Sequence, residues 1–245
     1  MRRPHISYIV CTTPRSGSGL LCEALWNTQL AGKPDEYFYR ENLKRWGAKS
    51  YADYIDAIIE HGTTPNGVFG LKLMWAQVRP LQIKVFLRAP HLAKLRMPIL
   101  LGSLFSDPRY IWLTRRDKLR QAVSFHRAMK TRNFRSVDGD TEEPSQTPDF
   151  DFRAIHRWMK RLERWDACWQ SFFDANRIAP LVVVYEDDLE HGYQEAGLRI
   201  LEYLKIPVPQ GLTFHASRRK QSDELSEAFV RLYQERRKRR SGLAE

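Results

Sequence analysis

The chain has 245 residues, which is enough for one sizeable hydrophobic core and does not call for a second domain. Its 40 Lys and Arg residues against 29 Asp and Glu residues give a formal net charge of +11, so we expect an anionic partner: a nucleotide, a nucleic acid, a sulfated sugar or a membrane surface. The cysteines Cys11, Cys22 and Cys168 form no C-x-x-C pair and have no histidine at metal-ligand spacing, which argues against a disulfide framework and a zinc site.

The basic N-terminal segment is followed by an apolar run only about one strand long, because Thr12 to Gly17 interrupt it. No apolar stretch of the sequence reaches the ~20 residues that cross a bilayer. We therefore expect no signal peptide, no stable membrane insertion and a cytoplasmic location.

Short apolar stretches rich in β-branched or aromatic residues predict four strands. They are Ile6 to Cys11, Val68 to Leu73, Tyr110 to Thr114 and Leu181 to Tyr185. Because three of them are almost continuously apolar, we expect buried parallel strands.

Apolar residues at helical spacing lie between these strands. They predict helices within residues 20–25, 119–129 and 152–173, and a last helix from about Asp223 to Arg240. Strands that alternate with helices are typical of an α/β fold with a central parallel sheet, here a single domain over residues 1–245.

Two polar segments have no assigned role. Residues 136–149 are acidic and contain two prolines, so we expect a mobile surface loop, either a lid or a spacer. The basic run Arg236 to Arg240 is typical of a solvated helix end.

The segment from Thr12 to Gly19 connects the first strand to a helix. Its small residues place backbone N–H groups at a helix N-terminus, where an anion can bind, and Arg15, Ser16 and Ser18 add donors. The segment lacks G-x-x-x-x-G-K-[ST] and has only Gly17 and Gly19 of a dinucleotide fingerprint, which argues against ATP hydrolysis and NAD chemistry. An ordinary strand-to-helix turn is the alternative.

Five segments, in order along the chain, resemble the Stf0 family of bacterial sulfotransferases from about residue 6 to about residue 238. They are PRSGSGLL at 14–21, GKPDEYF at 32–38, PNGVFGLKLMW at 65–75, RRDKLRQAVSF at 115–125 and RRKQSDEL at 218–225. The resemblance implies a P-loop-like three-layer fold and transfer of a sulfuryl group from 3′-phosphoadenosine-5′-phosphosulfate (PAPS) without a metal. The acceptor it implies is a hydroxyl group of a carbohydrate or glycolipid, with trehalose among the candidates.

The resemblance also implies roles for residues that bind PAPS. The loop that grips the 5′-phosphosulfate matches Arg15, Ser16, Gly17, Ser18 and Gly19, although Gly19 stands where the family usually has threonine, which puts one hydroxyl contact in doubt. Either Arg115 or Arg116, with Ser124, matches the 3′-phosphate site. A late segment that closes over this phosphate matches Arg219, Lys220 and Gln221.

For the chemical step, the resemblance implies that Glu36 is the general base; on composition alone it would be a surface carboxylate. Lys72 at a strand end either stabilises an oxygen of the transferring group or caps an exposed strand. Tyr37 and Trp75 are candidates for the acceptor face. The helical spacing of Trp158, Trp165 and Trp169 indicates core residues, and His126 is assigned to packing or the surface.

Two other functions compete with this interpretation. The net charge of +11 is compatible with a nucleic-acid-binding protein, although the sequence contains no recognisable module of that kind. A nucleotide phosphotransferase would share the fold, but paired metal-binding carboxylates are missing from the sequence. Aromatic residues from Tyr37 to Tyr39, expected to be exposed, suggest a homodimer.

Overall fold

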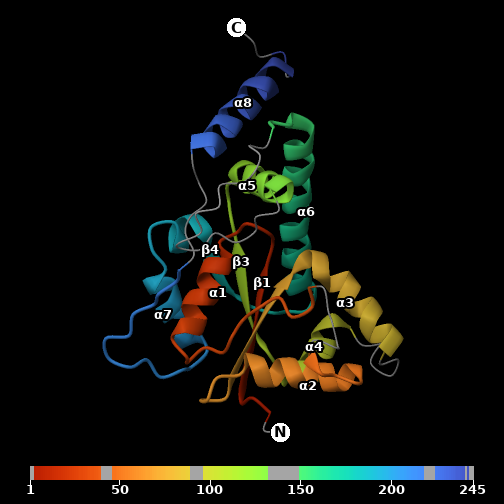
Figure 1. The fold of residues 1–245 in the computed structure, drawn as a ribbon, viewed down its shortest axis with the longest axis vertical. Coiled ribbons are helices and arrows are strands. Elements are labelled where there is room, and N and C mark those ends of the chain that lie inside the picture. The colour runs from red at the N-terminus through yellow and green to blue at the C-terminus, as the bar shows by residue number, and fades with distance from the viewer. Residues whose placement is uncertain are drawn as a thin grey trace.

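The protein is seen in a computed structural model that describes residues 3–39, 46–88, 96–131, 149–217, 224–240 and 242, without the side chains of residues 86 and 88. A four-stranded, fully parallel sheet in the order β2-β1-β3-β4 forms its centre (Figure 1). The strands are β1 (Ile6–Thr12), β2 (Val68–Met74), β3 (Arg109–Thr114) and β4 (Leu181–Val184). The predicted α/β fold and its four strands are therefore confirmed.

Side chains of β1 alternate between two hydrophobic clusters. Tyr8 and Val10 face one side of the sheet, whereas Ile9 and Cys11 face the other. All four are fully buried, as are most residues of β2, because both faces of the sheet are covered by helices.

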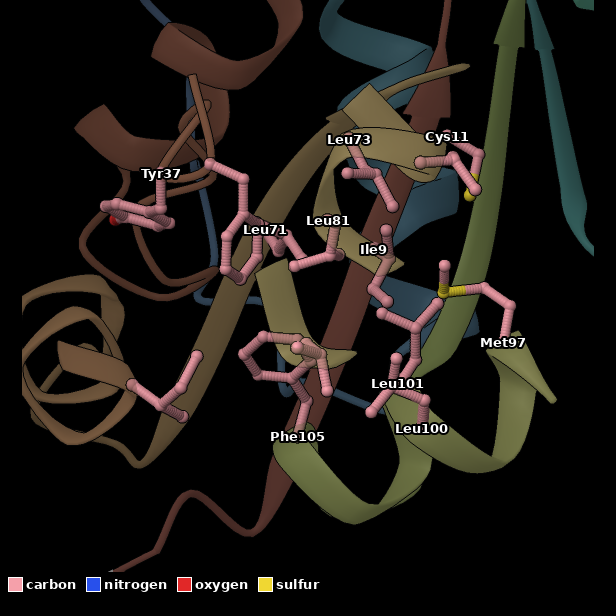
Figure 2. Close-up of a cluster of buried hydrophobic side chains, with 14 of the residues drawn as sticks. Ile9, Cys11, Tyr37, Leu71, Leu73, Leu81, Met97, Leu100, Leu101 and Phe105 are labelled. Atoms are coloured by element: carbon pink, nitrogen blue, oxygen red, sulfur yellow. The ribbon is translucent and has the colours of Figure 1, made fainter. Parts of the chain in front are cut away.

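Helices cover the two faces unequally. Side chains of α1 (Ser18–Asn27) and α7 (Gln194–Tyr203) pack on the face of Tyr8 and Val10. The opposite face packs against α2 (Tyr51–Gly62), α3 (Trp75–Arg88), α4 (Met97–Phe105) and α6 (Phe152–Ala175). Figure 2 shows this cluster, in which Leu71 and Ile9 of the sheet lie close to Leu81 and Phe105 of the helices. Helices therefore cover both faces of the sheet, which gives the predicted three layers.

A further cluster joins α5 (Lys118–Thr131), α6 and α8 (Glu224–Arg240). These helices extend beyond the end of the sheet at which the strands finish (Figure 1). Trp169 of the predicted tryptophan stripe is buried in the sheet-facing core, and Trp158 and Trp165 pack partly buried on this outer cluster. The assignment to the core is confirmed for Trp169, whereas Trp158 and Trp165 pack at the margin of the outer cluster.

The carboxyl edge of the sheet is where a ligand is expected. The chain passes from β1 to β2 on one side and then crosses to β3 on the other side of β1. Because the chain changes direction here, the loops after β1 and β3 point away from each other. Ligands of open α/β sheets bind in the crevice between such loops. The loop after β1 and the Arg115–Arg116 turn after β3 lie at this position. The expected mobile loop at 136–149 lies outside the described residues, except for Asp149.

Candidate active site at the carboxyl edge of the sheet

The loop after β1 depends on Gly17. This residue precedes α1 with φ of +88°, in the left-handed region that glycine tolerates best. A Cβ atom there would lie 2.7 Å from Cδ2 of Tyr185, so a side chain would also collide with the segment after β4. Ser18 and Gly19 then begin α1, and the N–H groups of this first turn have no partners within the helix. The loop thus presents the donors and the helix dipole that an anion requires.

The hydroxyl of Ser16 serves the loop itself. Ser16 is fully buried, and its Oγ lies 2.6 Å from Oγ1 of Thr12, which donates to the carbonyl oxygen of Leu113 at 2.8 Å. The carbonyl oxygen of Thr12 accepts a hydrogen bond from the Trp169 indole at 2.9 Å. These contacts fix the start of the loop against β3 and α6.

Arg15 connects the loop to α5. Its Nε donates to Oγ of Ser124 at 2.9 Å, across 109 residues of sequence. Its φ is +63°, an uncommon value outside glycine, so the surrounding contacts hold the backbone in this conformation. Two residues expected to bind different phosphates of one nucleotide therefore meet in space.

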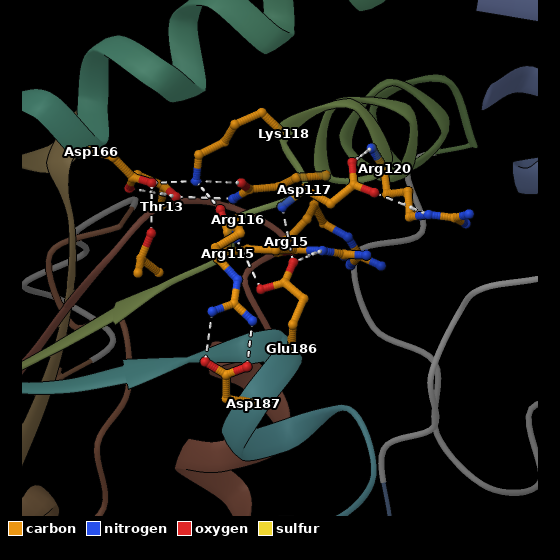
Figure 3. Close-up of polar contacts among 12 residues, drawn as sticks. Thr13, Arg15, Arg115, Arg116, Asp117, Lys118, Arg120, Asp166, Glu186 and Asp187 are labelled. Carbon is orange, nitrogen blue, oxygen red and sulfur yellow. Dashed lines mark hydrogen bonds and ion pairs between the residues drawn. The ribbon is translucent and has the colours of Figure 1, made fainter. Parts of the chain in front are cut away.

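The structure separates the two candidate arginines after β3. Arg115 is largely enclosed: its guanidinium lies 4.4 Å from the centre of the Tyr185 ring, and it donates to the carbonyl oxygen of Arg15 at 3.3 Å. Arg116 is 61% exposed and forms two hydrogen bonds with Asp187, one of them 2.7 Å long (Figure 3). Arg115 thus supports the loop, whereas Arg116 lies at the surface.

Glu186 forms hydrogen bonds with the backbone of the turn after β3. Its carboxylate accepts the N–H groups of Arg116 and Asp117, both at 2.9 Å, directly before α5. Burial alone would raise the pKa of Glu186, but these hydrogen bonds, together with the nearby Arg115 guanidinium, hold the pKa below its usual value. A carboxylate at this place also stabilises the N-terminus of α5.

Asp166 of α6 joins the ends of two strands. It is 8% exposed, accepts Oγ1 of Thr114 at 2.8 Å and Oγ1 of Thr13 at 3.3 Å, and forms an ion pair with Lys118 (Figure 3). Gln121 adds hydrogen bonds to Oγ1 of Thr13 and the carbonyl oxygen of Pro14, at 3.0 and 2.7 Å. The sequence analysis did not identify this network, which braces the loop after β1.

Glu36 lies next to Lys72 because the preceding residue is attached to the edge of β2. The carbonyl oxygen of Asp35 accepts the N–H of Lys72 at 3.1 Å, and Asp35 pairs with Leu71 in a parallel bridge. Nζ of Lys72 lies 3.0 Å from Oε1 of Glu36, with side-chain exposures of 7% and 26%. Gln77 of α3 donates to Oε2 of Glu36 at 2.8 Å. The expected base and the expected cation are thus brought together, with an amide that the sequence analysis missed.

The expected acceptor-face residues have different positions. Tyr37 is 6% exposed, its hydroxyl donates to the carbonyl oxygen of Lys33, and burial raises its pKa. Trp75 begins α3 and packs edge-on against Trp169, with ring centres 4.9 Å apart. The expectation of exposed aromatics at 37–39 is wrong for Tyr37 and Phe38, which are core residues; Tyr39 is 56% exposed.

The other candidate residues lie in the core or outside the described residues. His126 is buried near Phe229, in agreement with its assignment to packing. Arg219, Lys220 and Gln221 lie outside the described residues. Among the described residues, no helix is long and apolar enough to cross a membrane, and no group of three or more His, Cys, Asp or Glu residues is placed to hold a metal ion.

Comparison with known proteins gives consistent matches along most of the chain. The family model described as Stf0 sulphotransferase matches residues 7–236. A trehalose 2-sulfotransferase of Mycolicibacterium smegmatis is 32% identical over 211 residues, which cover 73% of this chain and 77% of that protein. A trehalose 2-sulfotransferase of Mycobacterium tuberculosis is 29% identical over 213 residues, covering 76% of this chain and 79% of the relative.

Proposed function

The chain belongs to the Stf0 sulphotransferase family and is a sulfotransferase, and from this premise we propose that it transfers a sulfuryl group from PAPS to a carbohydrate hydroxyl. The observation that carries the donor proposal is the hydrogen bond between Arg15 and Ser124. It joins the anion-binding loop after β1 to α5 at the switch point of the sheet. A nucleotide with phosphates at both its 5′ and 3′ positions fits two adjacent anion-binding elements.

The 5′-phosphosulfate is assigned to the loop from Arg15 to Gly19. The Gly17 turn and the first N–H groups of α1 supply its donors, and Ser16 acts through the bond that braces the loop. The 3′-phosphate is assigned to Ser124 and Arg116. Arg116 is preferred over Arg115 because its ion pair with Asp187 is exposed and can be exchanged for a phosphate at little cost.

The reaction follows from the pair at the edge of β2. The acceptor oxygen attacks sulfur in line, the bond from sulfur to the bridging phosphate oxygen breaks, and 3′-phosphoadenosine-5′-phosphate leaves with the electron pair. Glu36 takes the proton of the attacking hydroxyl, while the Lys72 ammonium stabilises the charge that develops on the bridging oxygen.

The acceptor class is supported by the relatives, both of which are named trehalose 2-sulfotransferases. Trehalose is therefore the first acceptor to assay, followed by other disaccharides and glycolipids. Trp75, partly buried at the start of α3, is kept as a candidate contact; Tyr37 is not retained because its side chain lies in the core.

Calorimetric titration tests the donor assignment. We expect 3′-phosphoadenosine-5′-phosphate, the stable product, to bind tightly, and ADP and a short DNA duplex to bind weakly. ADP lacks the 3′-phosphate and carries a second phosphate on its 5′ side, so it shows how tightly the loop after β1 binds a nucleotide without the contacts of Ser124 and Arg116. A preference for DNA would instead support the nucleic-acid-binding alternative, and equal binding of both nucleotides would refute the proposed 3′-phosphate site.

A further inference from the structure

We propose that Gln77 is a positioning residue for sulfuryl transfer: its side-chain amide holds the Glu36 carboxylate in the orientation from which it accepts the acceptor proton. The inference rests on the proposed role of Glu36 as base. Gln77 lies two residues beyond the family-like segment that ends at Trp75, and it comes from α3 rather than from the loop that carries Glu36.

Both oxygens of the Glu36 carboxylate have a donor. Oε1 lies 3.0 Å from Nζ of Lys72, and Oε2 lies 2.8 Å from Nε2 of Gln77. Two donors on different oxygens fix the plane of the carboxylate, and each oxygen keeps a second lone pair for the acceptor hydroxyl. The side chain of Glu36 is 26% exposed, so it is not sealed off from a substrate.

The orientation of the Gln77 amide is determined by its two partners. Oε1 of Gln77 accepts the backbone N–H of Met74 at 3.2 Å, next to the first turn of α3. The reversed amide would set its NH₂ group against that N–H and its oxygen against the carboxylate, so both contacts would be repulsive. Gln77 is 8% exposed, which further limits its motion.

The two donors have different duties during the reaction. Negative charge that develops on the bridging oxygen attracts the Lys72 ammonium, which then has two anionic groups to serve. Gln77 is neutral, so this charge draws it far less, and it keeps the carboxylate in place while Lys72 responds. Precise placement of a catalytic group is worth up to about 10²-fold in rate for a shift near 1 Å.

A double-mutant cycle tests whether Gln77 acts through Glu36. Glu36→Gln should lower kcat about 10²-fold or more while 3′-phosphoadenosine-5′-phosphate still binds. Gln77→Met, which keeps the side-chain length, should lower kcat about 10-fold with little change in either KM. In the Glu36→Gln background, the same substitution should change kcat less than about 2-fold, since the base it positions is already absent.

Gln77→Glu supplies the matched variant. A glutamate still accepts the Met74 N–H, so α3 keeps this contact, but it places a second carboxylate beside Glu36. Two carboxylates this close share a proton, so the acid limb of kcat/KM should move at least about one unit to higher pH. Lys72 and Asp35, the charged groups that adjoin the pair, are unchanged in these variants, and Gln77→Met, which removes a donor but adds no charge, should move the limb less than Gln77→Glu does.

The outcomes test the role of Gln77 and the role of Glu36 separately. Equal losses of kcat from Gln77→Met in both backgrounds, or an unmoved acid limb in Gln77→Glu, would show that Gln77 only supports the fold. Near wild-type turnover of Glu36→Gln would instead remove Glu36 as the base, and the inference would fall with it. Urea unfolding of each variant shows whether it is folded.

Discussion

Arg115 and Arg116 differ in how much the loop after β1 depends on them. Arg115 contacts the Arg15 carbonyl and the Tyr185 ring, whereas Arg116 contacts an exposed aspartate. A substitution at Arg115 therefore disturbs the loop that should bind any nucleotide. A substitution at Arg116 should be felt only by a ligand with a 3′-phosphate.

We predict that Arg116→Gln weakens binding of 3′-phosphoadenosine-5′-phosphate about 10- to 100-fold and leaves ADP binding nearly unchanged, because a charge-assisted phosphate contact is worth about 1.5–3 kcal/mol. Arg115→Gln should weaken both nucleotides. Calorimetry of the two variants with both ligands measures this. If Arg115→Gln alone discriminates between the nucleotides, the assignment of the two arginines must be exchanged.

A second prediction at the residue scale concerns pH. Because the pKa of Glu186 is lowered in the folded protein, its contribution to stability is complete above the unfolded pKa of about 4.3 and is lost as pH falls through the folded pKa. Glu186→Gln should therefore lower the free energy of unfolding by about 1 kcal/mol at pH 7.

The difference between wild type and Glu186→Gln should shrink as the pH falls below about 4.3. Urea unfolding at several pH values measures it. Asp187→Asn is the control: this carboxylate is 53% exposed, and its loss should change stability by less than about 0.5 kcal/mol. A Glu186→Gln difference that is constant down to pH 3 would contradict the assigned cause.

At the scale of elements, α5 and α6 are tied to the sheet by a buried polar network. Asp166 accepts hydrogen bonds from residues that follow β1 and end β3, and Lys118 of α5 supplies the opposite charge. Lys118 also contacts Oε1 of Gln121 at 3.2 Å, so it keeps a partner when Asp166 is changed.

We predict that Asp166→Ala destabilises the protein by about 3 kcal/mol, since it leaves a largely buried ammonium without its counter-ion. Glu163→Ala, which removes the exposed partner of Lys160 on the same helix, should cost less than about 1 kcal/mol. Urea midpoints of the two variants measure this contrast. Equal losses would mean that Asp166 contributes no more than a surface carboxylate.

The sequence predicted the strands well because they are apolar runs, and β1 and β2 are buried on both faces. It did not predict α3, which follows Met74 with no intervening loop and carries Pro80 in its interior. Nor did it predict α2, although Ser50 and Asp53 form a capping box before a periodic apolar run. The sequence hides α3 because no loop separates it from β2 and a proline lies inside it. The capping box before α2, in contrast, is a signal that the sequence does contain.

The candidate site was likewise predictable only in part. The loop after β1 and Glu36 were singled out by motifs that resemble the family, but nothing in the sequence indicates that Gln77 reaches Glu36 from another element. Asp166 did leave a trace: it lies between Leu162 and Trp169 on the apolar face of α6, where a carboxylate needs a partner. That partner, Lys118, is 48 residues away, and only the fold brings the two together.

For the whole molecule, the net charge of +11 attracts any anion, so binding alone does not identify the donor. Specific recognition requires that the matching nucleotide stabilise the folded protein more than another anion does. A ligand at about 100 times its Kd stabilises the native state by about 2.7 kcal/mol.

In a domain of this size each kcal/mol raises Tm by about 2–4 °C, so saturating 3′-phosphoadenosine-5′-phosphate should raise Tm by about 5–10 °C. ADP and inorganic sulfate at the same concentration and ionic strength should raise Tm by less than half as much, because neither engages both the loop and Ser124. Scanning calorimetry with the three ligands measures this. Equal shifts would mean that the positive charge of the surface, rather than the Arg15 and Ser124 constellation, accounts for nucleotide binding.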